Sequence, residues 1–140
     1  AIRLVEDLDR TERLKLHILN LGHSYLVSNW LASGGAGAPL VREIMADAKA
    51  RADLESLYSQ EVLPVFAAAD YDDAPAYVTA TLDRFANPYL AHRLSDIAQN
   101  HAEKLRRRIG LFLDWGVELG ADAPRPRLRQ ALAQADQPKA

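Results

Sequence analysis

A lysine, an asparagine and a histidine follow one another at short intervals near the start of the chain. They are Lys15, Asn20 and His23, in the order K-x-x-x-x-N-x-x-H. On a regular α-helix of about 100° per residue, Lys15 falls on the same stripe as Leu19 and Leu26. A lysine packed among leucines is desolvated, which favours its neutral amine, and a neutral amine near pH 7 is a general base. The pattern therefore predicts proton transfer by Lys15, unless its side chain extends past the apolar stripe to solvent.

The same helix is expected to carry a polar stripe, with Asn20 at its border with the apolar one. The other members of that stripe are Arg13, His17, Ser24 and Ser28. Because these residues gather on one side at helical spacing, the helix is predicted to be amphipathic.

Gly22 and His23 lie beside the apolar stripe. Gly22 has no side chain and leaves room for a ligand or another backbone. His23 falls between Leu16 and Leu19, where a histidine is more often a hydrogen-bonded core residue than a catalytic one.

A second group of polar residues surrounds Asn87-Pro88. Arg84 is a candidate contact for a substrate hydroxyl or carboxylate, or else it binds the free carbonyls at the end of its own helix. Asn87 is typical of an N-cap, with Pro88 in the first turn of the next helix. Polar residues then repeat at every fourth position, which is usually a solvated helix face. The repeating residues are His92, Asp96, Asn100, Lys104 and Arg108.

Helix-forming residues dominate the composition, and we find neither an alternating strand pattern nor a hairpin turn. The fold class is therefore predicted to be all-α, a multi-helical bundle forming a single domain over residues 1–140. The predicted helices are Arg10–Ala32 capped by Asp9 or Thr11, Pro39–Ala46, Asp47–Ala68 kinked near Pro64, Pro75–Phe85, one or two helices beyond Pro88, and Leu128–Ala135.

Composition excludes several classes of protein. The 140 residues include no cysteine, so disulfides, thiolate metal sites and cysteine nucleophiles are excluded. The net charge is -2, and no aromatic residues alternate with the run Arg106–Arg108, so no nucleic-acid partner is expected. No apolar run is long enough for a membrane span, and no signal peptide opens the chain. We therefore expect no contact with a membrane, and we expect a cytoplasmic location.

The two polar motifs together resemble the C-terminal domain of the polyol-specific long-chain dehydrogenases. That family includes mannitol dehydrogenases, mannitol-1-phosphate dehydrogenases, and tagaturonate and fructuronate reductases. The resemblance rests on the Lys15–His23 pattern and on Arg84-Phe-Ala-Asn87-Pro88, which is similar to the family's later R-F-x-N-P segment. It covers residues 5–119, and the stretch 96–104 is closer to the hexuronate-reductase branch.

The resemblance implies an all-α domain that works beside an N-terminal Rossmann-type domain, which this chain lacks and which binds NAD or NADP. It implies that Lys15 is the general base, that Asn20 orients the reacting oxygen, and that His23 bonds a substrate hydroxyl. Substrate-binding candidates are Arg84, His92 and Lys104, and the substrate is a small polyol or sugar acid. No metal is implied, and the stretch Gly34–Gly37 lacks G-x-G-x-x-G spacing, so no cofactor-binding residue is expected here.

Two other functions compete with this hypothesis. The chain could be a non-enzymatic α-helical interaction module in which Lys15, Asn20 and His23 complete a polar core network. A helical nucleic-acid-binding domain is disfavoured by the net charge. The absence of a starting methionine at Ala1 leads us to expect a piece of a longer protein.

Overall fold

The computed structural model describes residues 9–35, 40–121 and 123–136. Within these ranges the regular structure is helical apart from one isolated antiparallel bridge, Leu40 to Arg93. The predicted all-α, multi-helical class is confirmed. Pro39, which was expected in the first turn of the second helix, lies outside the described residues.

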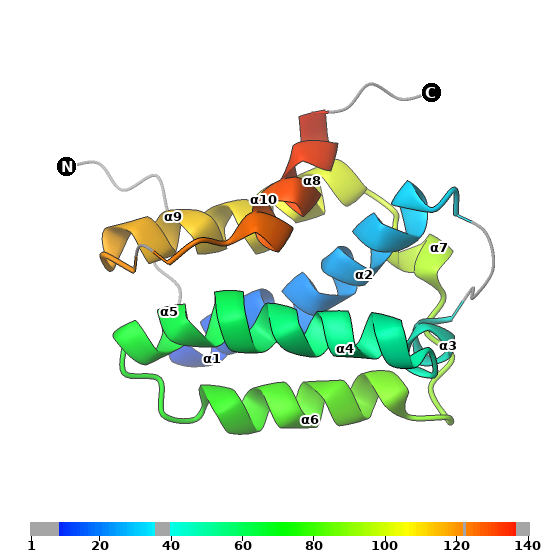
Figure 1. Cartoon of the computed structure of the whole chain (residues 1–140), viewed down its shortest axis with the longest axis horizontal. Helices are drawn as coiled ribbons and strands as arrows, with labels where there is room; N and C mark the ends of the chain where they lie inside the picture. Colours follow the sequence, from blue (N-terminus) through cyan, green and yellow to red (C-terminus); the bar gives the residue numbers. More distant parts are fainter. Residues whose placement is uncertain (1–8, 36–39, 122, 137–140) are drawn as a thin grey trace.

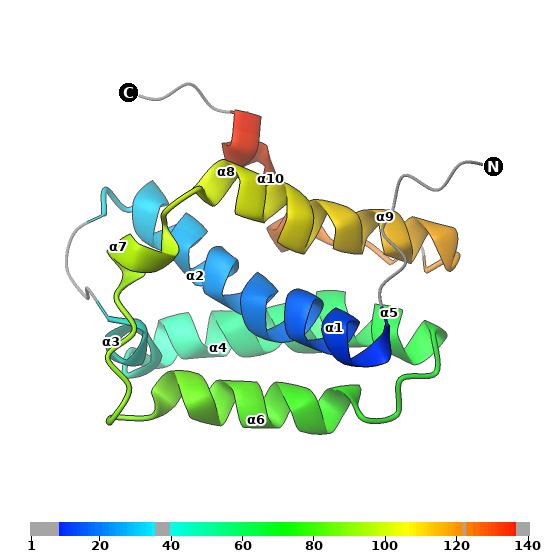
Figure 2. The same ribbon diagram turned by 180° about the vertical axis from the view of Figure 1, so that it is seen from behind.

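A continuous helical rod crosses the middle of the molecule (Figures 1 and 2). It consists of α1 (Arg10–Leu14), the π-helical segment η1 (Lys15–Asn20) and α2 (Leu21–Ala32). Asp9 caps its start, since its carboxylate accepts from the Glu12 N–H at 2.8 Å while Glu12 bonds the Asp9 N–H. The rod ends before Gly34 and Gly35, which adopt positive φ angles. The predicted first helix and its cap are confirmed.

Four helices and a π-helical segment cover one side of the rod. The short α3 (Val41–Met45) precedes α4 (Ala48–Leu57), η2 (Tyr58–Val62) and α5 (Leu63–Ala68), and α6 (Ala74–Ala86) runs beside them. Pro64 lies in the first turn of α5, directly after η2. Because proline has no N–H to donate, the backbone widens into the π-helical turn instead of continuing a regular helix. The predicted interruption near Pro64 is confirmed in this form.

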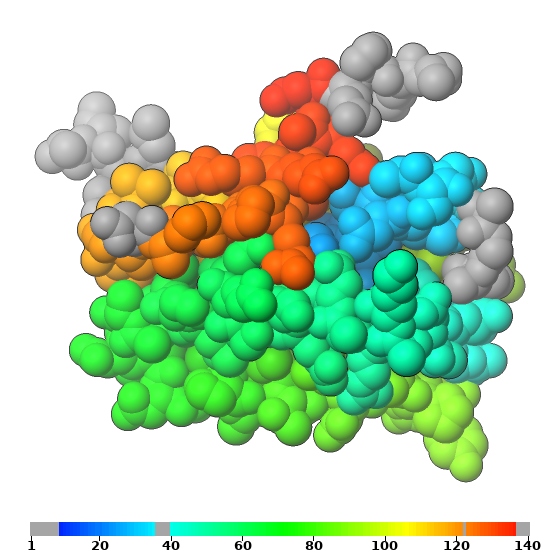
Figure 3. All heavy atoms as spheres, in the orientation of Figure 1, coloured from blue at the N-terminus to red at the C-terminus, as the bar shows by residue number. Residues whose placement is uncertain are grey.

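The other side of the rod is covered by the last third of the chain, whose helices α8, α9 and α10 lie above the rod in Figure 1. Its elements are α7 (Leu94–Ile97), α8 (His101–Leu105), η3 (Arg106–Gly110), α9 (Leu111–Glu118), α10 (Pro126–Ala133) and η4 (Gln134–Asp136). The buried Glu61 joins the two sides, because its carboxylate accepts from the Arg127 and Leu128 N–H groups in the first turn of α10. In the space-filling view the two layers meet over the first part of the rod, while the end of α2 stays visible (Figure 3).

The prediction that a helix starts at Pro88 is wrong. Asn87 ends α6, and its side chain accepts from the Tyr89 N–H at 2.8 Å instead of capping a following helix. The His92 carbonyl accepts from the Val41 N–H at 2.9 Å, and Arg93 pairs with Leu40. These tertiary bonds use backbone groups that a helix would need, so helix formation is delayed until Leu94.

The predicted stripes of the first helix are also corrected. Arg13, His17, Ser24 and Ser28 are buried, and Lys15 is exposed. The rod is packed on both sides, so most of its circumference is interior whatever its polarity. The prediction of a desolvated Lys15 therefore fails in this chain.

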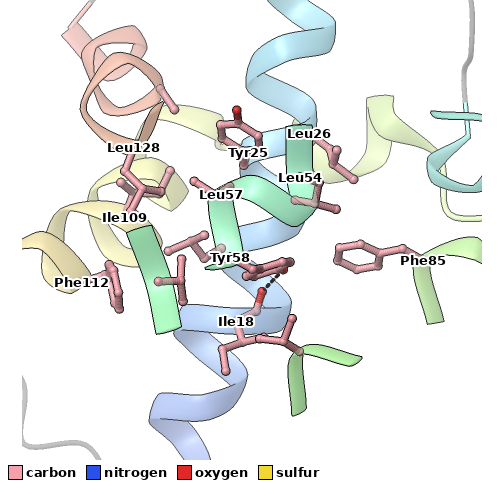
Figure 4. Packing of buried hydrophobic residues seen from close by; sticks show 14 of the residues in the cluster. Ile18, Tyr25, Leu26, Leu54, Leu57, Tyr58, Phe85, Ile109, Phe112 and Leu128 are labelled. Atoms are coloured by element: carbon pink, nitrogen blue, oxygen red, sulfur yellow. Dashed lines mark hydrogen bonds between the residues drawn. The ribbon is translucent and has the colours of Figure 1, made fainter. Parts of the chain in front are cut away.

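The core gathers around the meeting of the rod with α4, η2 and α6 (Figure 4). Gly22 lies at this contact, and a Cβ atom there would collide with the Tyr58 hydroxyl and come within 3.0 Å of the Phe85 ring. The room that Gly22 leaves is thus occupied by two core side chains, not by a ligand.

We expect Gly22→Ala to lower the free energy of unfolding by about 1–3 kcal/mol, because the added methyl overpacks the core. Chemical denaturation of the purified protein measures this change. Gly110→Ala is the matched control. Its Cβ would meet no neighbour closer than 3.8 Å, so it should be neutral or stabilising. Equal stability of the two variants would contradict the packing described for Gly22.

Candidate active site

The π-helical segment places Lys15 and Asn20 on the same side of the rod. In a π-helix the backbone repeats from i to i+5, and the Leu21 N–H at the end of η1 reaches the Leu16 carbonyl. On a regular α-helix five residues would turn through about 140° and separate the two side chains. Here Lys15 and Asn20 line one open hollow of about 300 Å³. His23 follows Asn20 by three residues, nearly one α-helical turn.

The wide turn of η1 is held by a buried hydrogen bond. The Tyr58 hydroxyl donates to the Ile18 carbonyl at 2.6 Å (Figure 4). Burial raises the pKa of Tyr58 far above its ordinary value, so the phenol stays a donor. Widening a helix by one residue disturbs its carbonyl ladder, and Tyr58 supplies a partner at that point.

The Lys15 side chain is exposed at the surface of this chain. Glu12, Leu16 and Arg107 share its hollow, and Asn20 is half-buried at the other side. The amine is therefore accessible to a small molecule or to another protein surface from that side.

His23 lies further along the rod, where its ring packs against α6 and the segment before α7. Its ring stacks on Phe85 with centroids 4.6 Å apart and meets the His92 ring edge-on at 5.6 Å. Burial, followed by the nearby positive groups, lowers the pKa of His23 to about 3. Its Nε2 atom is buried and has no hydrogen-bond partner among the described residues. A neutral imidazole with a free ring nitrogen can donate to, or accept from, a bound hydroxyl.

The structure brings the predicted substrate-binding residues around His23. Arg84 on α6 and Lys104 on α8 act on its pKa through their positive charges, and the His92 ring, before α7, contacts it edge-on. Two separate helices thus place cations near His23, and a third segment brings a second imidazole. The positive charge of Arg108 also acts on His23.

The individual contacts of these residues differ. Arg84 is exposed and lines a second hollow of about 280 Å³ with Leu19. Among the described residues, its guanidinium makes no hydrogen bond, so the alternative of a helix-end cap is not observed. The Lys104 ammonium donates to the Ile97 carbonyl at 2.8 Å, and burial, then Arg108, lowers the Lys104 pKa.

Two residues of this region were named in the sequence only as members of a polar stripe or repeat, and not as candidates for the site. Arg108 donates through Nη1 to the Ser24 hydroxyl at 3.0 Å and to the Asn20 carbonyl at 3.3 Å. His17 is fully buried, and its Nδ1 lies 3.1 Å from the Arg108 carbonyl. The available signal for Arg108 was its position four residues after Lys104, which places both on one helix face.

The residues that the structure describes contain no group of three histidine or carboxylate side chains placed to hold a metal ion. Within the same ranges, every helix is too short or too polar to cross a membrane.

We expect His17 and His23 to stay neutral at pH 5, because burial lowers the pKa of each to about 3. An unfolded histidine binds a proton near pH 6.5, so acidification from about pH 7 to 5 favours the unfolded chain by about 2 kcal/mol for each residue. An NMR titration of the imidazole resonances measures the two pKa values in the folded protein. A midpoint near pH 6.5 for either ring would contradict the burial described here.

Comparison with known proteins agrees with this fold and shows the family. The model of the family described as "Mannitol dehydrogenase C-terminal domain" matches residues 7–134. The chain is 36% identical to the altronate oxidoreductase of Klebsiella pneumoniae strain 342 over 132 residues, which are 94% of this chain and 26% of that protein. The altronate oxidoreductases of Enterobacter sp. strain 638 and Escherichia coli O1:K1 are 35% and 34% identical over the same shares. The chain thus spans about a quarter of the length of these relatives. Since the family model covers nearly the whole chain, the chain belongs to the mannitol dehydrogenase C-terminal domain family.

Proposed function

We propose that this chain is the catalytic and substrate-binding domain of an NAD(P)-dependent oxidoreductase. The reaction interconverts a sugar alcohol or aldonate with the corresponding ketose or keto-sugar acid. The observation that carries the proposal is the hollow that Lys15 and Asn20 share, which depends on the wide turn of η1, with His23 three residues further along the rod. The names of the altronate oxidoreductases that resemble it support the same class of reaction.

In this proposal Lys15 moves a proton at the reacting oxygen. In the oxidation direction its neutral amine takes the hydroxyl proton of a secondary alcohol, and in reduction the ammonium returns it to the carbonyl oxygen. The Asn20 amide donates to that oxygen and stabilises its developing negative charge. His23 bonds the reacting or the neighbouring hydroxyl through its unpartnered Nε2.

The described residues fit proton transfer but do not fit nucleotide binding. Gly34 and Gly35 follow the end of a helix, where no strand precedes them, so they do not form a dinucleotide cradle. We therefore assign the nicotinamide cofactor, which accepts or supplies the hydride, to a separate N-terminal domain of the full-length protein. Such a domain would also cover the open side of Lys15 and supply the desolvation that this chain lacks.

The group of cations around His23 favours an anionic substrate over a neutral one. Arg84, Lys104 and Arg108 place positive charge beside the proposed reacting centre. A carboxylate at the end of a sugar acid would be attracted to it. We therefore favour an aldonate and its keto acid over a neutral polyol.

The competing interaction module is less well supported. It requires Lys15, Asn20 and His23 to complete a buried polar network. Lys15 is exposed, and the buried Nε2 of His23 has no partner among the described residues. A core network would be expected to satisfy both.

The reaction class is tested by assaying the full-length protein for oxidation of NADH or NADPH. Tagaturonate and fructuronate are offered as keto acids, fructose is offered as a neutral ketose, and altronate and mannitol test the reverse direction. Turnover of a sugar or sugar acid is the expected result. No turnover of any of these compounds with either cofactor would contradict the proposal.

We expect Lys15→Ala to lower kcat at least about a hundredfold, because a positioned general base contributes about 10²- to 10⁴-fold. Because the exposed Lys15 side chain packs against few other atoms, the thermal midpoint of unfolding should stay within a few degrees of that of the unsubstituted protein. Lys49→Ala removes another exposed lysine, on α4, and is the matched control that should keep full activity. Normal turnover of the Lys15 variant would show that the base has been assigned wrongly.

A further inference from the structure

Arg108 is held against the rod by contacts from both its side chain and its backbone. Its guanidinium bonds the Asn20 carbonyl and the Ser24 hydroxyl through Nη1 alone. Its own carbonyl is 3.1 Å from Nδ1 of His17. His17 is packed against Phe112 and Trp115, with ring centroids at 5.3 and 6.1 Å. The guanidinium is therefore fixed beside one member of the proposed catalytic set before any substrate arrives.

The charge of Arg108 is not neutralised by a carboxylate, unlike the charges of several other arginines of this chain. Arg10 pairs with Asp73, Arg51 with Glu55, and Arg127 with Asp53 and Glu61. No described carboxylate pairs with Arg108, although its side chain is half-buried. Burial lowers the Arg108 pKa, and no acidic group offsets that effect. A partly buried cation without a counter-ion is costly, and an anion bound beside it would relieve that cost.

The free edge of the guanidinium has the right form for a carboxylate. Both of its hydrogen bonds within the described part of the chain use Nη1. The remaining N–H groups leave a fork that can donate two parallel bonds to one carboxylate. Lys104 lies one helical turn earlier. The positive charge of Arg108 lowers the pKa of Lys104 and that of His23.

We propose that Arg108 binds the carboxylate of an aldonate substrate and is the residue that selects it over a neutral sugar alcohol. The inference rests on the proposed oxidoreductase function and adds the substrate class to it. An alditol with the same chain length would leave the guanidinium without an anionic partner, so the site discriminates against it.

The test uses the full-length protein with the substitutions Arg108→Gln and Arg106→Gln. Glutamine can keep hydrogen bonds to Asn20 and Ser24 while losing the charge and the fork. Arg106 lies in the same π-helical segment but bonds the Ala135 carbonyl, so it is a control of equal charge. Altronate serves as the aldonate, and the alditol of the same configuration serves as the neutral probe, measured as a substrate or as a competitive inhibitor.

We expect Arg108→Gln to raise KM for altronate at least tenfold, because two charge-assisted bonds are lost. Its kcat should change less than threefold, as should the KM or inhibition constant of the alditol. Arg106→Gln should leave all of these constants within twofold. Arg108→Lys keeps the charge without the fork and should give an intermediate KM, which covers the case in which the glutamine variant does not fold.

Three results would overturn the inference. The first is an equal loss of affinity for altronate and alditol in Arg108→Gln, which would assign Arg108 to helix packing alone. The second is an unchanged KM for altronate in both Arg108 variants. The third is turnover of neutral polyols but not of aldonates by the unsubstituted protein, in which case the oxidoreductase proposal would still stand. Turnover of neither class would instead reject the oxidoreductase proposal itself.

Discussion

The hydrogen bond from the Tyr58 hydroxyl to the Ile18 carbonyl is the contact on which the arrangement of the site depends. It lies at the π-helical turn that brings Lys15 and Asn20 onto one side of the rod. Gly22 makes the contact possible, because any side chain there would displace Tyr58. The proposed chemistry therefore depends on a contact between two fully buried residues. This contact lies about one helical turn from the exposed Lys15.

The charged side chains near the start of α10 and those near His23 differ in whether they are paired. At the start of α10, the Arg127 guanidinium pairs with the carboxylates of Asp53 and Glu61. Glu61 also accepts from the Leu128 N–H, and together these contacts hold α10 in place. Around His23 the cations gather without such partners. Paired charges stabilise the fold, while unpaired ones prepare a surface for an anion. This contrast is the physical basis for preferring a sugar acid as the substrate class.

The helices and their boundaries followed from local chemistry. Asp9 and Glu12 form the expected capping box, Pro64 marks the expected interruption, and Gly34 follows the end of the first helix. Each of these is a property of a few neighbouring residues, so sequence is sufficient. The segment after Asn87 was predicted wrongly because its backbone bonds Val41 and Leu40, which are distant in sequence. No local pattern reports such partners.

The sequence by itself determined the all-α class, the family and the identity of the candidate residues Lys15, Asn20 and His23. It did not determine their environment. Angles counted at a regular helical period placed Lys15 in an apolar stripe, whereas the π-helical turn and packing on both sides of the rod leave Lys15 exposed and bury His17. Only the tertiary structure gathered Arg84, His92, Lys104 and Arg108 around His23. Burial and long-range charge depend on which segments meet in space, and that is settled by packing of the whole chain.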